Sequence, residues 1–385
     1  MKISTILRWA DRYPYFYFHL QNDPYDDLSH YRWIVGVGKS PYRGNFEEKQ
    51  WFMGGWTYEW GSPYKKPLID FPKVAFFIPQ VVIAMEEAPP WEDEIPPSKI
   101  LTGARFLYNT LPREEYIDRV QRIQDHIYRG EVYQVNLSFG LLWEGTLDPI
   151  GAYLQLLRTF PTGYNYLFKY RDRYVIGASP ERFFWQWRDL IAQQPIKGTI
   201  ARGKTWEEDV QQVDTLRNSP KELAENTMIV DLVRNDLSRV CVPGSVQVPV
   251  WAYVRSYANL HHLISTVYGQ REKEVTWAEA AMSLFPAGSM TGAPKQAALE
   301  YIHLYEPVGR GIYSGAIGYI SPEGLADFAV VIRSWVYCKS SNKLLLQVGS
   351  GITYDSDPKS EWEESWLKAE KLLQAVGLSD QAVRS

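Results

Sequence analysis

The stretch YNYLFKYRDRYVIGASPERFFWQWRDLI, residues 164–191, decides the fold class. Its runs of Tyr, Phe, Val and Trp are typical of strands, and the polar RDR between the first two runs is typical of a tight turn. A similar run lies upstream at 132–143. We therefore expect a meandering antiparallel sheet formed by residues 132–143, 164–170, 174–178 and 183–191.

Helical and strand-like segments continue on both sides of this stretch. Helical spacing of apolar residues predicts helices over 112–130 and 358–376, and Ser219 followed by Pro220 predicts the start of a third, with Glu222 at the capping-box position. Further strands are expected at 314–320, 326–337 and 344–348. The sequence therefore predicts an α+β fold with two groups of strands, each followed by a helix.

Composition narrows the function to chemistry on small molecules. A net charge of -4 provides no basic face, which argues against nucleic acid as a partner. Two cysteines are too few for a disulfide framework and suit a reducing compartment. Charged residues interrupt the N-terminal apolar stretch, and the apolar segment 74–85 is too short to cross a bilayer. We expect a cytoplasmic protein that does not enter a membrane.

Two of the expected helical regions each carry a pair of glutamates three residues apart. They are Glu222 with Glu225, and Glu361 with Glu364, and this spacing places each pair on one helix face. A solvated surface is the simpler explanation, and capping alone accounts for Glu222. Apolar neighbours favour the alternative that the pairs turn inward. Carboxylates that converge need a cation, and oxygen donors without nearby Cys or His indicate Mg²⁺.

Other segments offer candidate chemistry, each with a structural alternative. Lys197 follows an apolar strand, where a poorly hydrated amine acts as a nucleophile, although composition alone favours an ordinary surface lysine. Glu181 suits a general acid if it is buried, or else an ordinary ion pair with Arg182. The Gly-rich segments 285–295 and 348–352 suit either an anionic ligand near the backbone or simple bends.

Taken together, these segments resemble the chorismate-utilising enzymes over roughly residues 112–375. The family comprises anthranilate synthase component I, aminodeoxychorismate synthase component I, and the isochorismate and salicylate synthases. The matching motifs are, in order, EVYQVNLS (131–138), ASPERF (178–183), PIKGTIARG (195–203), AENTMIVDLVRNDLSRV (224–240), HHLIST (261–266), FPAGSMTGAPK (285–295), YSGAIGY (313–319), VVIRSW (330–335) and GSGITYDSDPKSEWEESWLKA (349–369).

The resemblance implies a sandwich of two antiparallel sheet groups with flanking helices, and a division of the chain. Residues 110–378 would form the catalytic domain that binds chorismate, and residues 1–100 would form an N-terminal region packed on it. The Pro-rich stretch APPWEDEIPP at 88–97 predicts a surface connection between the two.

The resemblance also implies roles for individual residues. Glu225 and Glu364 would ligate Mg²⁺, with Glu222 and Glu361 as outer partners. Lys197, Glu181 and His262 would be catalytic. The implied substrate contacts are Gly198, Thr199, Thr291, Tyr313, Arg333, Gly349, Ser350 and Gly351.

Two positions favour one branch of the family. Gln134 stands where the water-using isochorismate and salicylate synthases carry a lysine base, and an amide cannot take a proton from water. Lys197 stands where aminodeoxychorismate synthases carry a lysine that attacks chorismate, and where anthranilate synthases usually carry a small residue. The resemblance therefore implies aminodeoxychorismate synthase component I, with anthranilate synthase component I as the alternative. A non-catalytic binding subunit is a further alternative.

The source of ammonia is expected to be a second protein. Neither Cys241 nor Cys338 lies in the small-residue elbow expected of a glutaminase nucleophile. We therefore expect a separate glutamine amidotransferase subunit to supply ammonia for the reaction with chorismate.

Overall fold

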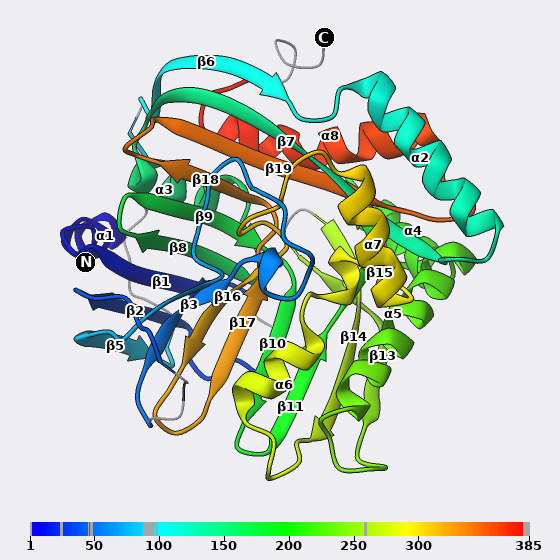
Figure 1. Ribbon diagram of the computed structural model, residues 1–385, viewed down its shortest axis with the longest axis horizontal. Helices are drawn as coiled ribbons and strands as arrows, with labels where there is room; N and C mark the ends of the chain where they lie inside the picture. Colours follow the sequence, from blue (N-terminus) through cyan, green and yellow to red (C-terminus); the bar gives the residue numbers. More distant parts are fainter. Residues whose placement is uncertain are drawn as a thin grey trace.

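Two large antiparallel sheets lie face to face in the computed structural model of the protein (Figure 1). The structure describes residues 2–23, 26–44, 46, 49–87, 96, 97, 99–257 and 260–379. A buried aromatic cluster with members from both sheets, including Tyr17, Tyr166, Trp185 and Tyr319, fills the space between them. The predicted sandwich of two antiparallel sheet groups is confirmed.

The first sheet has ten strands and the second has nine. In spatial order, the first contains β15 (Gly292–Ala293), β7 (Gln134–Leu147), β19 (Lys343–Ile352), β18 (Ser334–Cys338), β9 (Arg173–Ser179), β8 (Tyr164–Tyr170), β1 (Tyr15–Gln21), β2 (Trp33–Gly38) and β5 (Val81–Met85), with β6 (Leu101–Asn109) also paired to β7. The second contains β12 (Ile196–Ala201), β14 (Leu260–Gln270), β11 (Leu190–Gln194), β10 (Arg182–Trp187), β17 (Ala326–Val330), β16 (Ala316–Ile320), β3 (Phe52–Trp56) and β4 (Val74–Phe77), with β13 (Gln247–Ser256) also paired to β14.

Helices cover the outer faces of both sheets (Figure 1). The helices are α1 (Ile3–Ala10), α2 (Arg113–Tyr128), α3 (Pro149–Thr159), α4 (Trp206–Arg217), α5 (Pro220–Ser238), α6 (Trp277–Leu284), α7 (Lys295–Tyr305) and α8 (Pro358–Ala375), with short 3-10 turns η1 (Tyr58–Trp60) and η2 (Gly288–Met290). Helices α2, α3 and α8 pack on the first sheet, whereas α5 and α6 pack on the second. No helix in the described part of the chain is long and apolar enough to cross a membrane.

Two of the expected strands are each divided in the structure. The run expected over 183–191 forms the hairpin β10–β11, because Arg188 adopts a left-handed conformation at φ 56° and reverses the chain. This hairpin belongs to the second sheet, whereas β7, β8 and β9 belong to the first, so the expectation of a single meander was wrong. The run expected over 326–337 forms β17 in the second sheet and β18 in the first, and the chain crosses between the sheets at 331–333. Residue composition could not show the second break, because Val331 and Ile332 continue the strand-like run, whereas the polar pair Arg188–Asp189 is a turn signal that the sequence prediction did not use.

Other local predictions are confirmed. Helices α2 and α8 fall within one or two residues of their expected bounds. Ser219 caps α5 by accepting a hydrogen bond from the Glu222 backbone N–H at 3.4 Å, and Pro220 occupies the first turn.

The N-terminal residues contribute strands to both sheets. β1, β2 and β5 extend the first sheet, and β3 and β4 extend the second. Most of the surface connection expected at 88–97 lies outside the described residues. The proposed boundary between residues 1–100 and 110–378 therefore remains a prediction, and the sheets themselves run across it.

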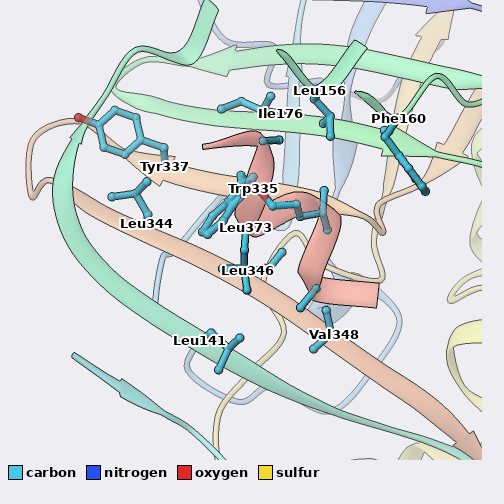
Figure 2. Packing of buried hydrophobic residues seen from close by; sticks show 14 of the residues in the cluster. Leu141, Leu156, Phe160, Ile176, Trp335, Tyr337, Leu344, Leu346, Val348 and Leu373 are labelled. Carbon is cyan, nitrogen blue, oxygen red and sulfur yellow. Dashed lines mark hydrogen bonds between the residues drawn. The ribbon is translucent and has the colours of Figure 1, made fainter. Parts of the chain in front are cut away.

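Trp335 anchors α8 to the first sheet. Its side chain is 1% exposed, packs edge-on against Trp143, and donates from Nε1 to the Leu372 carbonyl at 2.9 Å. Figure 2 shows it among Leu344, Leu346 and Leu373, where strand and helix side chains meet.

We predict that Trp335→Ala lowers the free energy of unfolding by about 3–5 kcal/mol, because it removes a buried ring and leaves a carbonyl without its donor. Chemical denaturation followed by circular dichroism measures this change. The control is Trp206→Ala, since Trp206 is 76% exposed; its effect should stay within about 0.5 kcal/mol. Equal effects of the two substitutions would contradict the assignment of Trp335 to the core.

Candidate active site

Lys197 lies where three elements meet. Its Nζ is 3.5 Å from Glu225 Oε2, which brings β12 against α5. A Cβ placed on Gly351 would lie 3.2 Å from the same Nζ, which places the end of β19 on the other side. Two motifs far apart in sequence are therefore assembled around one lysine.

The expected dry surroundings of this lysine are only partly present. The Lys197 side chain is 16% exposed and the Glu225 side chain 19% exposed, so both are largely withdrawn from solvent. A carboxylate at 3.5 Å offsets part of the cost of burying an ammonium. The amine must leave this ion pair before it can act as a nucleophile.

The four glutamates of the predicted metal site lie on two helices, α5 and α8. Burial raises the pKa of Glu222, and the carboxylates of Glu225 and Glu364 raise it further. Burial also raises the pKa of Glu361, with Glu364 acting in the same direction. Glu364 on α8 therefore lies close enough to Glu222 on α5 for their charges to interact, and the inward-turning arrangement of all four glutamates stays a prediction.

Glu222 is placed by a close approach of the backbone. Gly198 adopts a φ of 89°, which favours glycine, and a Cβ there would lie 3.0 Å from Glu222 Oε2. The Glu222 carboxylate thus reaches the β12 backbone. The Glu222 backbone N–H donates to Ser219 Oγ.

Each of the other glutamates also has a partner of its own. Glu364 pairs with Lys368 at 2.7 Å, and Glu361 Oε1 accepts from Ser356 Oγ at 2.7 Å. In the described residues, no three His, Cys, Asp or Glu side chains are grouped closely enough to hold a metal ion. The donor chemistry nevertheless fits Mg²⁺, since repelling carboxylates with only oxygen donors are what this cation neutralises. Ligation by Glu225 and Glu364 stays a prediction.

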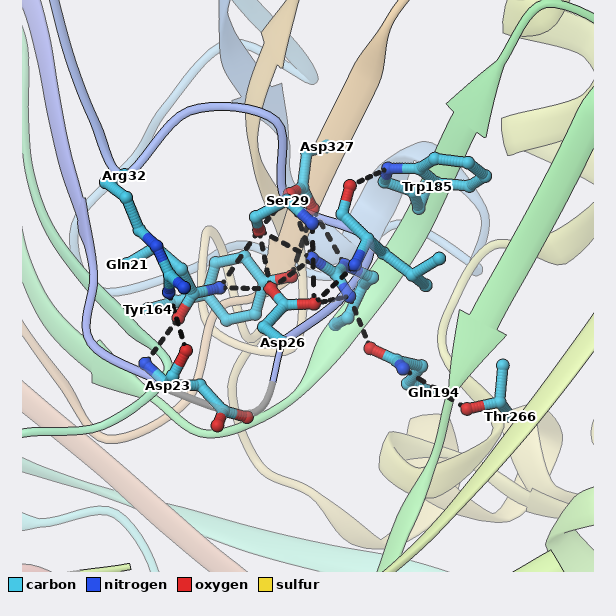
Figure 3. Close-up of polar contacts among 12 residues, drawn as sticks. Gln21, Asp23, Asp26, Ser29, Arg32, Tyr164, Trp185, Gln194, Thr266 and Asp327 are labelled. Atoms are coloured by element: carbon cyan, nitrogen blue, oxygen red, sulfur yellow. Dashed lines mark hydrogen bonds and ion pairs between the residues drawn. The ribbon is translucent and has the colours of Figure 1, made fainter. Parts of the chain in front are cut away.

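Glu181 is buried and does not pair with Arg182. Arg182 binds Asp26 at 2.7 Å and Asp327 at 3.0 Å in a separate buried network (Figure 3). Burial raises the pKa of Glu181 to about 7, although Ser289 and Lys197 lower it. Its carboxyl is therefore divided between protonated and ionised forms near neutral pH, which suits a general acid–base.

His262 and Thr199 form a pair across neighbouring strands. Thr199 Oγ1 lies 2.8 Å from His262 Nδ1. Burial lowers the pKa of His262 to about 3, with the positive charge of Arg333 acting in the same direction. The imidazole is therefore uncharged at neutral pH and can act through hydrogen bonds.

Arg333 lies at the crossing between the two sheets and has a left-handed φ of 51°. Burial lowers its pKa, whereas Tyr313 and Glu364 oppose this shift, so both residues are close enough to interact with it. A strained conformation at a charged residue beside the glutamates is typical of a functional site.

The remaining expected substrate contacts fall into two groups. Gly349, Ser350 and Gly351 pair with β7 along the end of β19, and the Gly349 carbonyl accepts from Lys368 Nζ at 2.9 Å. The side chains of Ser350 and Thr291 are engaged within the protein. Ser350 Oγ bonds the Tyr116 hydroxyl at 2.8 Å, and Thr291 Oγ1 donates to the Ala287 carbonyl at 3.1 Å.

Sequence reasoning missed two residues of this site. Lys368 follows Glu364 by one helical turn, a spacing that could have revealed the pair. Ser289 donates to Glu181 Oε1 at 2.6 Å, and no pattern in the sequence indicates this contact. Gln134 is fully buried, and within the described chain neither of its amide atoms has a hydrogen-bond partner. A Cβ on Gly351 would lie 2.7 Å from its Nε2, so it borders the same space.

Comparison with known proteins gives the family. The sequence profile of the chorismate binding enzymes matches residues 37–374. The chain belongs to the chorismate binding enzyme family. This match begins before residue 100, which agrees with the strands that the N-terminal residues add to both sheets.

The chain is similar to several anthranilate synthases. The chain is 39% identical over 275 residues to anthranilate synthase component 1 of Saccharolobus solfataricus and 38% identical over 273 residues to that of Lactococcus lactis. Each match covers 71% of this chain, but only 64% and 59% of the respective relative. The crystal structure of anthranilate synthase component I from Streptococcus pneumoniae is similar with a TM-score of 0.72 at 26% identity, covering 93% of this chain and 89% of that one.

We predict that stability falls as pH rises through the range in which Glu181 titrates. Burial raises its pKa in the folded protein from 4.5 to about 7, so the folded state keeps a proton that the unfolded state releases. Stability from this group is full below about pH 4.5 and is lost as pH approaches and passes about 7.

Glu181→Gln should remove this dependence of stability on pH. Between pH 5 and pH 8, wild type should lose about 2–3 kcal/mol relative to this variant, measured by urea unfolding at both pH values. Glu300→Gln, on the exposed face of α7, is the control and should keep the wild-type dependence. Parallel pH profiles for wild type and Glu181→Gln would contradict the raised pKa.

Proposed function

We propose that this protein is the chorismate-aminating component of a synthase that receives ammonia from a glutamine amidotransferase. Membership of the chorismate binding enzyme family supports the substrate. The gathered lysine, arginine and glutamates support a site for a dicarboxylate and a divalent cation. Two products are compatible with amination, and a different observation favours each.

The names of the relatives favour anthranilate formation. Both sequence relatives and the solved structure are anthranilate synthase component I, the alternative of our sequence analysis. This support exceeds what the same comparisons give to aminodeoxychorismate synthase. This chain matches only about 60% of the length of the two sequence relatives. Their names therefore do not establish what individual residues of this chain do.

Lys197 favours amination at C4, and this observation carries our conclusion. A reaction that only adds ammonia at C2 of chorismate includes no step for the lysine amine that lies beside Gly351 and Glu225. An amine there suits attack on the ring itself. We therefore propose aminodeoxychorismate synthase component I activity and keep anthranilate synthase component I as the second candidate.

The proposed reaction uses this lysine twice. Lys197 Nζ bonds to C2 of chorismate, the ring double bonds shift, and the 4-hydroxyl leaves as water with a proton from Glu181. Ammonia then adds at C4, the double bonds shift back, and the bond between C2 and the lysine breaks with its electron pair returning to Nζ. The ammonium formed at C4 gives a proton back to Glu181. A carboxyl with a pKa of about 7 can both give up and regain a proton in such a cycle.

The other residues would bind and orient the substrate. Arg333 would grip one carboxylate, and uncharged His262 would donate or accept a hydrogen bond near the side chain. Glu225 and Glu364, with Glu222 and Glu361 behind them, would hold Mg²⁺, which supplies a Lewis acid for a substrate carboxylate.

The cysteines support an external source of ammonia. Cys241 and Cys338 are both buried, and burial raises the pKa of the Cys241 thiol to about 11. A glutaminase needs an accessible thiolate, and both cysteines are buried.

Product identity tests the proposal. We expect protein incubated with chorismate, Mg²⁺ and ammonium to form 4-aminobenzoate only after a lyase is added. Lys197→Ala should reduce this product at least about a hundredfold while Mg²⁺ binding is kept. The control is Lys204→Ala, at an exposed position. Anthranilate fluorescence without lyase would establish the second candidate, and absence of any turnover would favour a non-catalytic binding subunit.

The metal assignment has a separate test. Glu364→Gln should weaken Mg²⁺ binding roughly tenfold or more in calorimetry on the protein alone, because it removes one anionic oxygen donor. Its side chain is 54% exposed, so the substitution should not disturb packing. Glu363→Gln changes the exposed neighbour on α8 and is the matched control. Equal Mg²⁺ affinities in both variants would remove Glu364 from the metal site.

A further inference from the structure

Glu181 depends on one side-chain hydrogen bond. It is 6% exposed, and Ser289 Oγ donates to its Oε1 at 2.6 Å. The carboxyl lies at the start of β10, whereas the serine belongs to η2 in the loop between α6 and α7. The contact therefore joins two segments more than a hundred residues apart.

The loop that carries Ser289 is fixed on both sides of this residue. Arg310 Nη1 donates to the Met290 carbonyl at 2.7 Å, and the Asn136 N–H donates to the Thr291 carbonyl at 2.8 Å. Gly292 packs so closely on β7 that a Cβ there would lie 1.9 Å from the Gln134 carbonyl oxygen. The serine hydroxyl is thus held in place before any ligand binds, as a supporting group of an active site must be.

The direction of the bond decides where the proton of Glu181 resides. When the serine donates to Oε1, Oε2 is the oxygen left to carry the proton. We propose that Ser289 is a positioning residue that holds Glu181 by Oε1 and directs Oε2 toward the substrate as the proton-bearing atom. The catalytic consequence of this contact rests on the proposed function; the contact itself does not.

The charged surroundings of Glu181 fix the sign of the expected shift. The positive charge of Lys197 on β12 lowers the pKa of Glu181, as the hydrogen bond from Ser289 does. The charge of Arg182 is neutralised by Asp26 and Asp327. A donated hydrogen bond stabilises the carboxylate, so its removal must raise the pKa of Glu181.

Infrared titration of the protein without substrate tests the contact. The band of protonated Glu181, assigned with Glu181→Gln, should disappear with a midpoint near pH 7 in wild type. In Ser289→Ala the midpoint should rise by about half to one pH unit. Ser289→Thr keeps the hydroxyl and should restore the wild-type value. Ser283→Ala, on α6, makes the same change six residues away and should leave the midpoint in place.

Enzyme kinetics test the catalytic consequence of the contact between Ser289 and Glu181. Ser289→Ala should lower kcat for chorismate about tenfold with little change in KM, and should move the alkaline limb of the pH profile upward like the infrared midpoint. An unchanged midpoint in Ser289→Ala, or an equal shift in Ser283→Ala, overturns the inference. A shifted midpoint with an unmoved kinetic limb supports the contact and counts instead against Glu181 as the acid of the proposed function.

Discussion

Burial of like charge is the constraint on which this candidate site depends. Burial raises the pKa of Glu222 on α5 and of Glu361 on α8, and the negative charge of Glu364 acts on both in the same direction. Lys197 and Lys368 offset part of this charge. A fold that gathers so much like charge must fix both helices rigidly, and the two sheets with their buried aromatic interface provide that support.

The candidate site residues lie where strands end and where the chain crosses from one sheet to the other. Lys197 lies on β12 of the second sheet, whereas Gly349 and Gly351 lie on β19 of the first. Arg333 lies where the chain crosses between the two. The site is thus a product of the sandwich, and neither sheet could form it alone.

Buried ion pairs and hydrogen bonds around Arg310 and Arg182 hold the segments that surround Glu181. Arg310 is buried between Glu306, the Met290 carbonyl and Asn136, and so fixes the loop that meets Glu181. The Arg182 network ties the N-terminal residue Asp26 to Asp327 beside the same strand. These buried, fully bonded charges explain how a carboxylic acid can be kept away from solvent and still be held in one orientation.

The sequence by itself determined the fold class, the bounds of helices α2 and α8 and the N-cap of α5. Helical spacing of apolar residues and the cap at Ser219 are local signals, which depend only on neighbouring residues. Only the tertiary structure decided that 183–191 and 326–337 each divide into two strands, that Arg182 pairs with Asp26 instead of Glu181, and that Ser289 bonds that acid. Those outcomes depend on which distant segments are brought into contact, and the free energy of such contacts is not encoded in the spacing of neighbouring residues.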